Sequence, residues 1–192
     1  MSAAAPTVHG GGFDDPATGS ARAFRAAMRA MARPGEILQL DAARPPGPLS
    51  PAAGTLILTL CDPDTGLHLA GACDTPEIRG WVAFHTGAPV VKAGEADFAV
   101  GRWEALCPLD RYRPGTPEYP DSSATLIVEV ETLEAAGSVL RGPGIRDSAR
   151  LSLPDPAALA ANAGRYPLGL DFFFTCGRRV AALPRSTAIS DG

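Results

Sequence analysis

Hydrophobic residues recur at helical spacing early in the chain. The first such stretch begins at Ser20 and ends at Pro34-Gly35, a pair that stops a helix. Its apolar face is made by four residues: Ala21, Phe24, Met28 and Met31. The rest of its surface carries four arginines: Arg22, Arg25, Arg29 and Arg33. This pattern predicts an amphipathic helix with a positive side.

Three further helices are predicted from their starts. Ser50 is a good N-cap residue and Pro51 a good first helical residue, so the segment AAGTLILTLC that follows is predicted to form a buried helix. Periodicity alone does not exclude a strand for its TLILTL part. Thr75-Pro76 opens a helix that runs to about Phe84. Asp155-Pro156 opens another that ends before Gly164.

The strands are predicted from β-branched and alternating runs. They cover residues 36–40, 67–71, an edge-like segment at Val90-Val91, 96–100, 124–133, SVLRG at 138–142, 170–176 and 180–184. Residues 106–121 are dense in Pro, Tyr and Arg and predict an irregular connection. The apolar run LDFFFTC at 170–176 is typical of a strand buried on both faces. Helices that alternate with strands indicate a layered α/β domain with a mixed sheet.

Length and composition fit one domain. The chain has 192 residues, 45% of them hydrophobic, which is enough for a single sizeable core. We predict a mobile N-terminal arm over residues 1–19, a single α/β domain over 20–187 and a C-terminal tail over 188–192.

Charge and hydropathy exclude several classes of protein. The net charge of −4 argues against a nucleic-acid binder with a basic surface. No apolar run is long enough to cross a bilayer, and the first residues do not resemble a secretory signal, so we expect a cytoplasmic protein without membrane contact. In that reducing compartment Cys61, Cys73, Cys107 and Cys176 are expected to be buried small hydrophobes rather than disulfides.

The usual catalytic motifs are not found in the sequence. The cysteines and histidines do not have metal-ligand spacing, and no serine lies in a Gly-x-Ser-x-Gly elbow. We therefore predict neither a metal nor a catalytic residue.

Five residues are candidates for ligand binding. His85 stands where a helix ends, Asp171 begins an apolar strand in which a carboxylate needs a partner, and Arg185 follows the last strand. Gly142 and Gly144 form a turn whose amides could face an anion, although a tight turn needs no ligand.

Several blocks of the chain together resemble the PhnH family of the bacterial carbon-phosphorus lyase pathway. They are FRAAMRAMARPG (24–35), LTLCDPDT (58–65), FHTGAPVV (84–91), SATLIVEVETL (123–133), GPGI (142–145) and PLGLDFFFTCGRRVAALPRST (167–187). The blocks span nearly the whole chain, and the last is the most specific.

The resemblance implies a three-layer α/β/α fold similar to the large domain of pyridoxal-phosphate-dependent transferases, but without that cofactor or any other. A pyridoxal enzyme needs a Schiff-base lysine, and Lys92, the only lysine, lies beside a predicted edge strand. The resemblance also implies a homodimer that joins PhnG, PhnI and PhnJ-like subunits in a core complex. That complex forms a ribose 1-phosphonate 5-triphosphate from ATP and a phosphonate.

Two functions follow as hypotheses. In the first, the chain is a required subunit of this transferase complex that is not catalytic by itself. In the second, it is a free-standing small-molecule enzyme or binder with a site near His85, Asp171 and Arg185.

Overall fold

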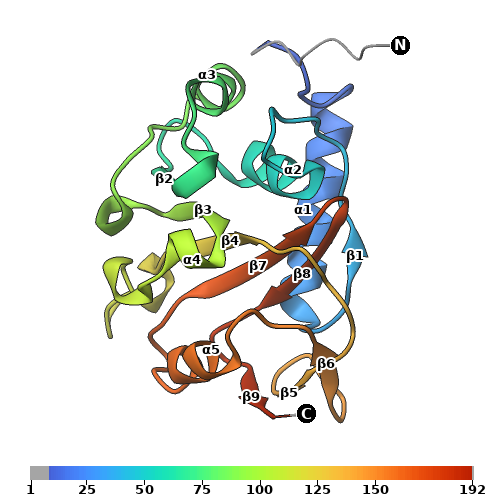
Figure 1. Cartoon of the computed structure of the whole chain (residues 1–192), viewed down its shortest axis with the longest axis vertical. Coiled ribbons are helices and arrows are strands. Elements are labelled where there is room, and N and C mark those ends of the chain that lie inside the picture. Colours follow the sequence, from blue (N-terminus) through green and yellow to red (C-terminus); the bar gives the residue numbers. More distant parts are fainter. Residues whose placement is uncertain (1–8, 192) are drawn as a thin grey trace.

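A six-stranded mixed sheet forms the centre of the structure, a computed structural model that describes residues 9–191 (Figure 1). Its strands lie in the order β1 (Leu38–Gln39), β8 (Arg179–Leu183), β7 (Asp171–Cys176), β4 (Thr125–Glu129), β3 (Phe98–Arg102) and β2 (Leu67–Leu69). Strands β2, β3, β4 and β7 are parallel, whereas β8 and β1 run antiparallel to their neighbours. The prediction of an α/β fold with a mixed sheet is confirmed.

Helices and a small second sheet cover the two faces of the central sheet. One face packs against α1 (Pro16–Ala32), α2 (Pro51–Leu60) and α3 (Pro76–His85). The other packs against α4 (Trp103–Leu106), α5 (Pro156–Ala163) and the antiparallel strands β6 (Ala149–Leu151), β5 (Ser138–Arg141) and β9 (Ala188–Ser190). Short 3-10 turns join these elements at η1 (Gly71–Cys73), η2 (Ala93–Glu95), η3 (Leu109–Arg111) and η4 (Pro120–Ser122).

Strand β7 shows why the sheet needs both layers. Phe172 and Phe174 point into the core beside α4 and α5, whereas Phe173 points into the core beside α1, α2 and α3. All three rings are almost fully buried. The prediction that 170–176 is a strand buried on both faces is confirmed, because side chains alternate along a strand and both sides of this one are apolar.

The longer helices begin at capped residues, as the sequence predicts. The side chains of Ser50, Thr75 and Asp155 each accept a hydrogen bond from a backbone N–H three residues later, and proline follows each of them. These caps satisfy amides that would otherwise have no partner at the helix ends. The predicted helix is confirmed for TLILTL, which lies in α2, and the strand that periodicity left open for it is not formed.

The ends of the domain differ from the predicted arm and tail. Helix α1 begins at Pro16 with Asp15 as its cap, four residues before the predicted start. Before it, the carbonyl of Gly10 accepts a hydrogen bond from Trp81 Nε1 at 3.0 Å. The predicted arm is therefore wrong for residues 9–19, while residues 1–8 lie outside the described part. At the other end, residues 188–190 pair with β5 as strand β9, so the predicted tail is structured there.

The face of α1 that packs on the core is not the one that its large apolar residues form. Ala23, Ala27 and Ala30 are buried, whereas Phe24 and Met28 are 50% and 54% exposed. Small side chains let the helix approach α2 and β8 closely. The apolar pattern predicted the helix but not its orientation.

Two predicted strands need correction, and a third strand was missed. Val90 forms only an isolated bridge with Leu67, because the η2 turn follows soon after it. Strand β4 ends at Glu129 instead of residue 133, since its partner β7 turns away at Gly177. Strand β6, whose residues Ala149–Leu151 have no extended apolar run, was not predicted.

We expect Gly144→Ala to destabilise the domain by about 2 kcal/mol or more, because a Cβ there would overlap the carbonyl oxygen of Ala32 and the residue has φ +82. Gly94→Ala is the matched control, because the nearest neighbour of its Cβ would lie at 3.7 Å. Urea unfolding of the two variants checks this. Equal midpoints would contradict the tight contact between this turn and α1.

Candidate functional site

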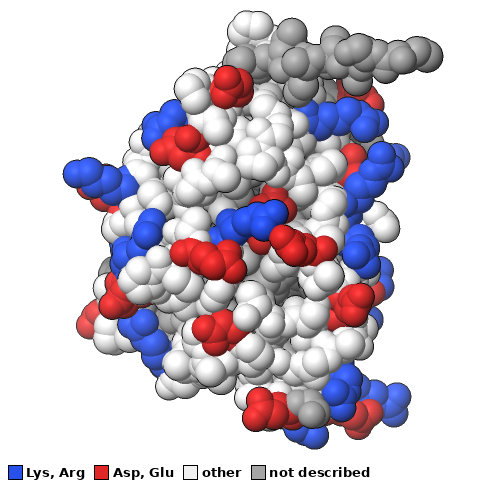
Figure 2. All heavy atoms as spheres, viewed as in Figure 1, with Lys and Arg blue, Asp and Glu red and all other residues white. Residues whose placement is uncertain are grey.

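A cleft opens where the parallel strands end. Arg102 ends β3 and Glu129 ends β4, and the segments that follow them carry Glu104 and Glu131. These four residues and Val130 line two adjoining depressions of about 420 and 350 Å³, which we call the strand-end cleft. Figure 2 shows acidic and basic side chains together at the middle of the face that Figure 1 presents. In open α/β sheets, ligands bind outside the carboxyl ends of the strands.

Glu129 joins the sheet to helix α2 at the floor of this cleft. Its Oε1 accepts a hydrogen bond from the backbone N–H of Ser50 at 2.7 Å, and its Oε2 accepts one from Thr175 Oγ1 at 2.9 Å. Thr175 is its register partner on β7, and Ser50 caps α2. Burial raises the pKa of the Glu129 carboxyl, and the hydrogen bonds oppose that change only in part.

Cys73 lines the same cleft, and its side chain is buried. Burial, with a smaller contribution from the charge of Glu129, raises the pKa of its thiol to about 11. A thiol with such a pKa is protonated at neutral pH, and the thiolate is the reactive form.

The four cysteines are free thiols, as the sequence predicts. Cys61 and Cys73 are buried, whereas Cys107 and Cys176 are only partly buried. The expectation of burial is therefore confirmed for two of the four. Cys107 lies after α4 and Cys176 ends β7, and both positions are at the ends of elements, where burial is incomplete.

The balance of charge in the cleft limits what it can bind. Three carboxylates face one guanidinium, and Arg102 Nη1 already donates to Glu131 Oε1 at 2.9 Å. A phosphonate or triphosphate would meet net negative charge there, whereas an ammonium, a guanidinium or a set of hydroxyls would meet acceptors. The cleft is suited to cationic or hydroxyl-bearing groups.

His85 lies at the far end of α3 from Thr75. Its Nε2 is 3.1 Å from the carbonyl oxygen of Gly10, and its ring packs against Trp81 and Phe84. It lines a separate depression of about 590 Å³ beside the start of α1. His85 thus holds the segment before α1 against α3.

Asp171 and Arg185 form an ion pair. Asp171 Oδ1 accepts hydrogen bonds from the backbone N–H of Arg185 at 2.8 Å and from its Nε at 3.1 Å, and Arg185 Nη2 contacts the second carboxylate oxygen. The Arg185 and Asp171 side chains are only 13% and 21% exposed. Arg185 Nη1 also donates to the carbonyl of Pro120. The pair anchors the segment after β8 to the start of β7.

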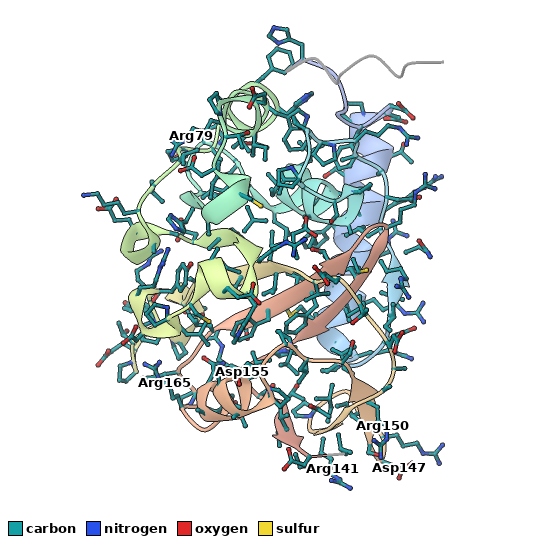
Figure 3. All side chains as sticks on the ribbon, viewed as in Figure 1. Arg79, Arg141, Asp147, Arg150, Asp155 and Arg165 are labelled. Carbon is teal, nitrogen blue, oxygen red and sulfur yellow. The ribbon has the colours of Figure 1, made fainter. Side chains whose placement is uncertain are left out.

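The structure therefore brings together two of the three residues that were expected to share a pocket. Arg185 lines a depression with α5 and β9, at the opposite end of the molecule from α3 (Figure 1). Figure 3 shows the same separation between Arg79 of α3 and Arg141 and Arg150 of the small sheet. His85 is not part of one site with Asp171 and Arg185.

Gly142 and Gly144 fit the alternative interpretation, a tight turn. Ile145 N–H donates to the carbonyl of Gly142 at 3.2 Å, and a Cβ on Gly142 would lie 3.0 Å from the carbonyl oxygen of Ser186. Both glycines are needed where backbone approaches backbone.

Arg102 and Glu129, which line the strand-end cleft, were not among the site residues predicted from the sequence. Arg102 and Glu129 are ordinary charged residues in sequence, and the signal that could have found them is their position at the ends of neighbouring parallel strands. Strand β4 was predicted to continue to residue 133, which hid Glu129 inside a strand.

Residues 9–191 contain neither a candidate metal-binding cluster nor a candidate membrane-spanning helix. This part of the chain holds no group of three or more His, Cys, Asp and Glu side chains arranged to bind a metal ion. None of its helices combines the length and the apolar character that a bilayer span requires.

The protein is a layered α/β domain of the class that carries a polar cleft at the ends of its parallel strands. Within that class, the chain belongs to the PhnH family. The family model, described as bacterial phosphonate metabolism protein (PhnH), matches residues 11–190.

The chain is also similar to two proteins whose names state a role. The chain is 42% identical over 191 residues to the Rhizobium meliloti (strain 1021) protein named alpha-D-ribose 1-methylphosphonate 5-triphosphate synthase subunit PhnH, covering 95% of this chain and 96% of that protein. It is 28% identical over 175 residues to the putative C-P lyase subunit protein HtxG of Stutzerimonas stutzeri, covering 88% and 84%. Both names describe subunits.

We expect Glu129→Gln to change how stability depends on pH. The folded state raises the pKa of this carboxyl, so it binds the proton more tightly than the unfolded chain, and the stability of the wild type falls as pH rises from the usual glutamate range through the raised pKa. Glutamine keeps an acceptor for Ser50 and removes that dependence. The free energy of unfolding of the variant, minus that of the wild type, should therefore be larger at about pH 7 than at about pH 4. Urea unfolding at the two pH values measures this difference. Glu131→Gln, at a side chain that is 79% exposed, is the control. An equal difference at both pH values would contradict the burial of Glu129.

We expect Arg185→Gln to lower the free energy of unfolding by about 2 kcal/mol, because it leaves the Asp171 carboxylate without its partner in a largely buried place. Arg102→Gln, which breaks an ion pair at the surface, should cost less than about 1 kcal/mol. Chemical denaturation measures both. A double-mutant cycle with Asp171→Asn that shows no coupling would contradict the anchor.

Proposed function

We propose that this protein is a required subunit of a complex that forms ribose 1-methylphosphonate 5-triphosphate from ATP and methylphosphonate, in the breakdown of phosphonates. The observation that carries the proposal is the 42% identity to a named subunit of such a synthase over nearly the full length of both chains. The family match over residues 11–190 supports the same role.

The chemistry of the strand-end cleft agrees with a subunit that does not itself hold the anionic reactants. ATP and a phosphonate both carry several negative charges, whereas Glu104, Glu129 and Glu131 outnumber Arg102 in the cleft. A site for those reactants needs guanidinium groups, amides or cations. The partner subunits therefore supply it.

The partners in this proposal are PhnG, PhnI and PhnJ-like proteins, and the chain itself forms a homodimer within a cytoplasmic assembly. The fold is that of the large domain of pyridoxal-phosphate-dependent transferases without the cofactor. Lys92 supports this last point, since it precedes the η2 turn and is not among the residues that line the strand-end cleft.

The alternative of a free-standing enzyme or binder gains no support from the arrangement of its three candidate residues. His85 lines a depression beside the start of α1, whereas Arg185, with Asp171, lies at the depression beside α5 and β9. A single small ligand could not contact all three.

Deletion of the encoding gene tests the proposal. We expect growth on methylphosphonate as the only phosphorus source to stop, growth on inorganic phosphate to continue, and the gene supplied in trans to restore the first. Normal growth of the deletion strain on methylphosphonate would contradict the proposed role.

A further inference from the structure

Helix α1 has two apolar faces, and the core uses only one of them. The inner face is made of Ala23, Ala27 and Ala30, which are buried against the rest of the domain. A helix with one buried face and solvent on the other normally carries polar residues outward. In α1 a second apolar row faces outward instead.

This second row, the α1 outer stripe, has regular spacing. It consists of Ala17, Ala21, Phe24, Met28 and Met31. The successive steps of four and three residues are those of a heptad repeat, which keeps a row of side chains facing a partner helix. Phe24 and Met28 at its centre are about half exposed, whereas Met31 at its end is partly buried and packs against the core. Adjacent exposed large apolar side chains mark an interaction surface more often than isolated ones do.

The charge beside the stripe indicates the kind of partner. Helix α1 contains three arginines and no acidic residue, and a fourth arginine is its C-cap. At about 100° per residue, Arg25 and Arg29 lie on one flank of the stripe, and the opposite flank is the buried alanine face. Figure 2 shows basic side chains along the edge of the molecule where Figure 1 places α1. This flank is positive although the whole chain carries a net charge of −4.

One of the two flanking arginines is already engaged within the chain. Arg29 Nε donates to Glu36 Oε2 at 3.1 Å, which offsets its charge. Arg25, by contrast, has an exposed position one residue after Phe24, beside the centre of the stripe. Arg25 is therefore the residue of this flank best placed to meet a charge on a docked partner.

The same charge argues against a second copy of this chain as the occupant. Two copies that met through the stripe as an antiparallel pair would place the arginine flanks of both helices side by side. Like charges in such positions repel and weaken association. An acidic flank on the other helix would instead attract Arg25.

We propose that the α1 outer stripe docks an amphipathic helix of a different subunit of the assembly. That helix is apolar along its seam, where it covers Phe24 and Met28, and carries Asp or Glu on the side that meets Arg25. The inference rests on the proposed function, because it assigns a surface to the partner subunits.

The test uses the full-length tagged chain, co-expressed with the PhnG, PhnI and PhnJ-like subunits of its host and purified on a sizing column with light scattering. In the variant Phe24→Ser/Met28→Ser we expect recovery of partner subunits to fall about tenfold or more, as when a central apolar anchor is removed. Arg25→Glu should reduce recovery several-fold, most strongly at low salt. Phe84→Ser, at an apolar residue that is 56% exposed on α3, is the matched control and should recover partners like the wild type.

Further outcomes separate the possible failures. The isolated double variant should keep the thermal unfolding midpoint and the oligomeric mass of the wild-type chain, since both side chains point away from the core. A lower oligomeric mass would show that a second copy occupies the stripe and would overturn the inference, as would wild-type recovery of partners by the double variant. If the wild-type chain itself recovers no partner, the proposed function fails, and this inference fails with it.

Discussion

Strand β7 is buried on both faces, and this burial determines where the other layers of the domain lie. Phe172 and Phe174 require one covering layer, and Phe173 requires another. The parallel strands β3 and β4 extend the sheet on one side of β7, and the hairpin to β8 extends it on the other. Two layers bury these side chains. One layer consists of α1, α2 and α3, and the other consists of α4, α5 and the small sheet.

This arrangement also creates the strand-end cleft. Parallel strands end at one edge of the sheet, so Arg102 and Glu129 meet there, and Glu129 ties that edge to the start of α2. The cleft is acidic, whereas the outer flank of α1 is basic. The domain therefore carries two surfaces of opposite charge.

Much of the fold could be predicted from the sequence because its signals are local. Capping residues such as Ser50 mark helix starts whatever surrounds them, and an apolar run marks β7. The orientation of α1 could not be predicted, because alanines pack inward and Phe24 outward only when α2 and β8 are in place. Asp171 was recognised as a carboxylate that needs a partner, and the ion pair with Arg185 supplies it, but the distance of His85 from that pair depends on the tertiary fold. Glu129 became visible only when the end of β4 was known.

Whether this chain works as a synthase subunit can be decided by purifying a tagged copy from its host, grown on methylphosphonate, and measuring the native mass of the species that is recovered. We expect a complex in which this chain and the other synthase subunits are present in a fixed ratio that survives a sizing column at physiological salt. Recovery of this chain alone, from cells that are consuming methylphosphonate, would contradict it.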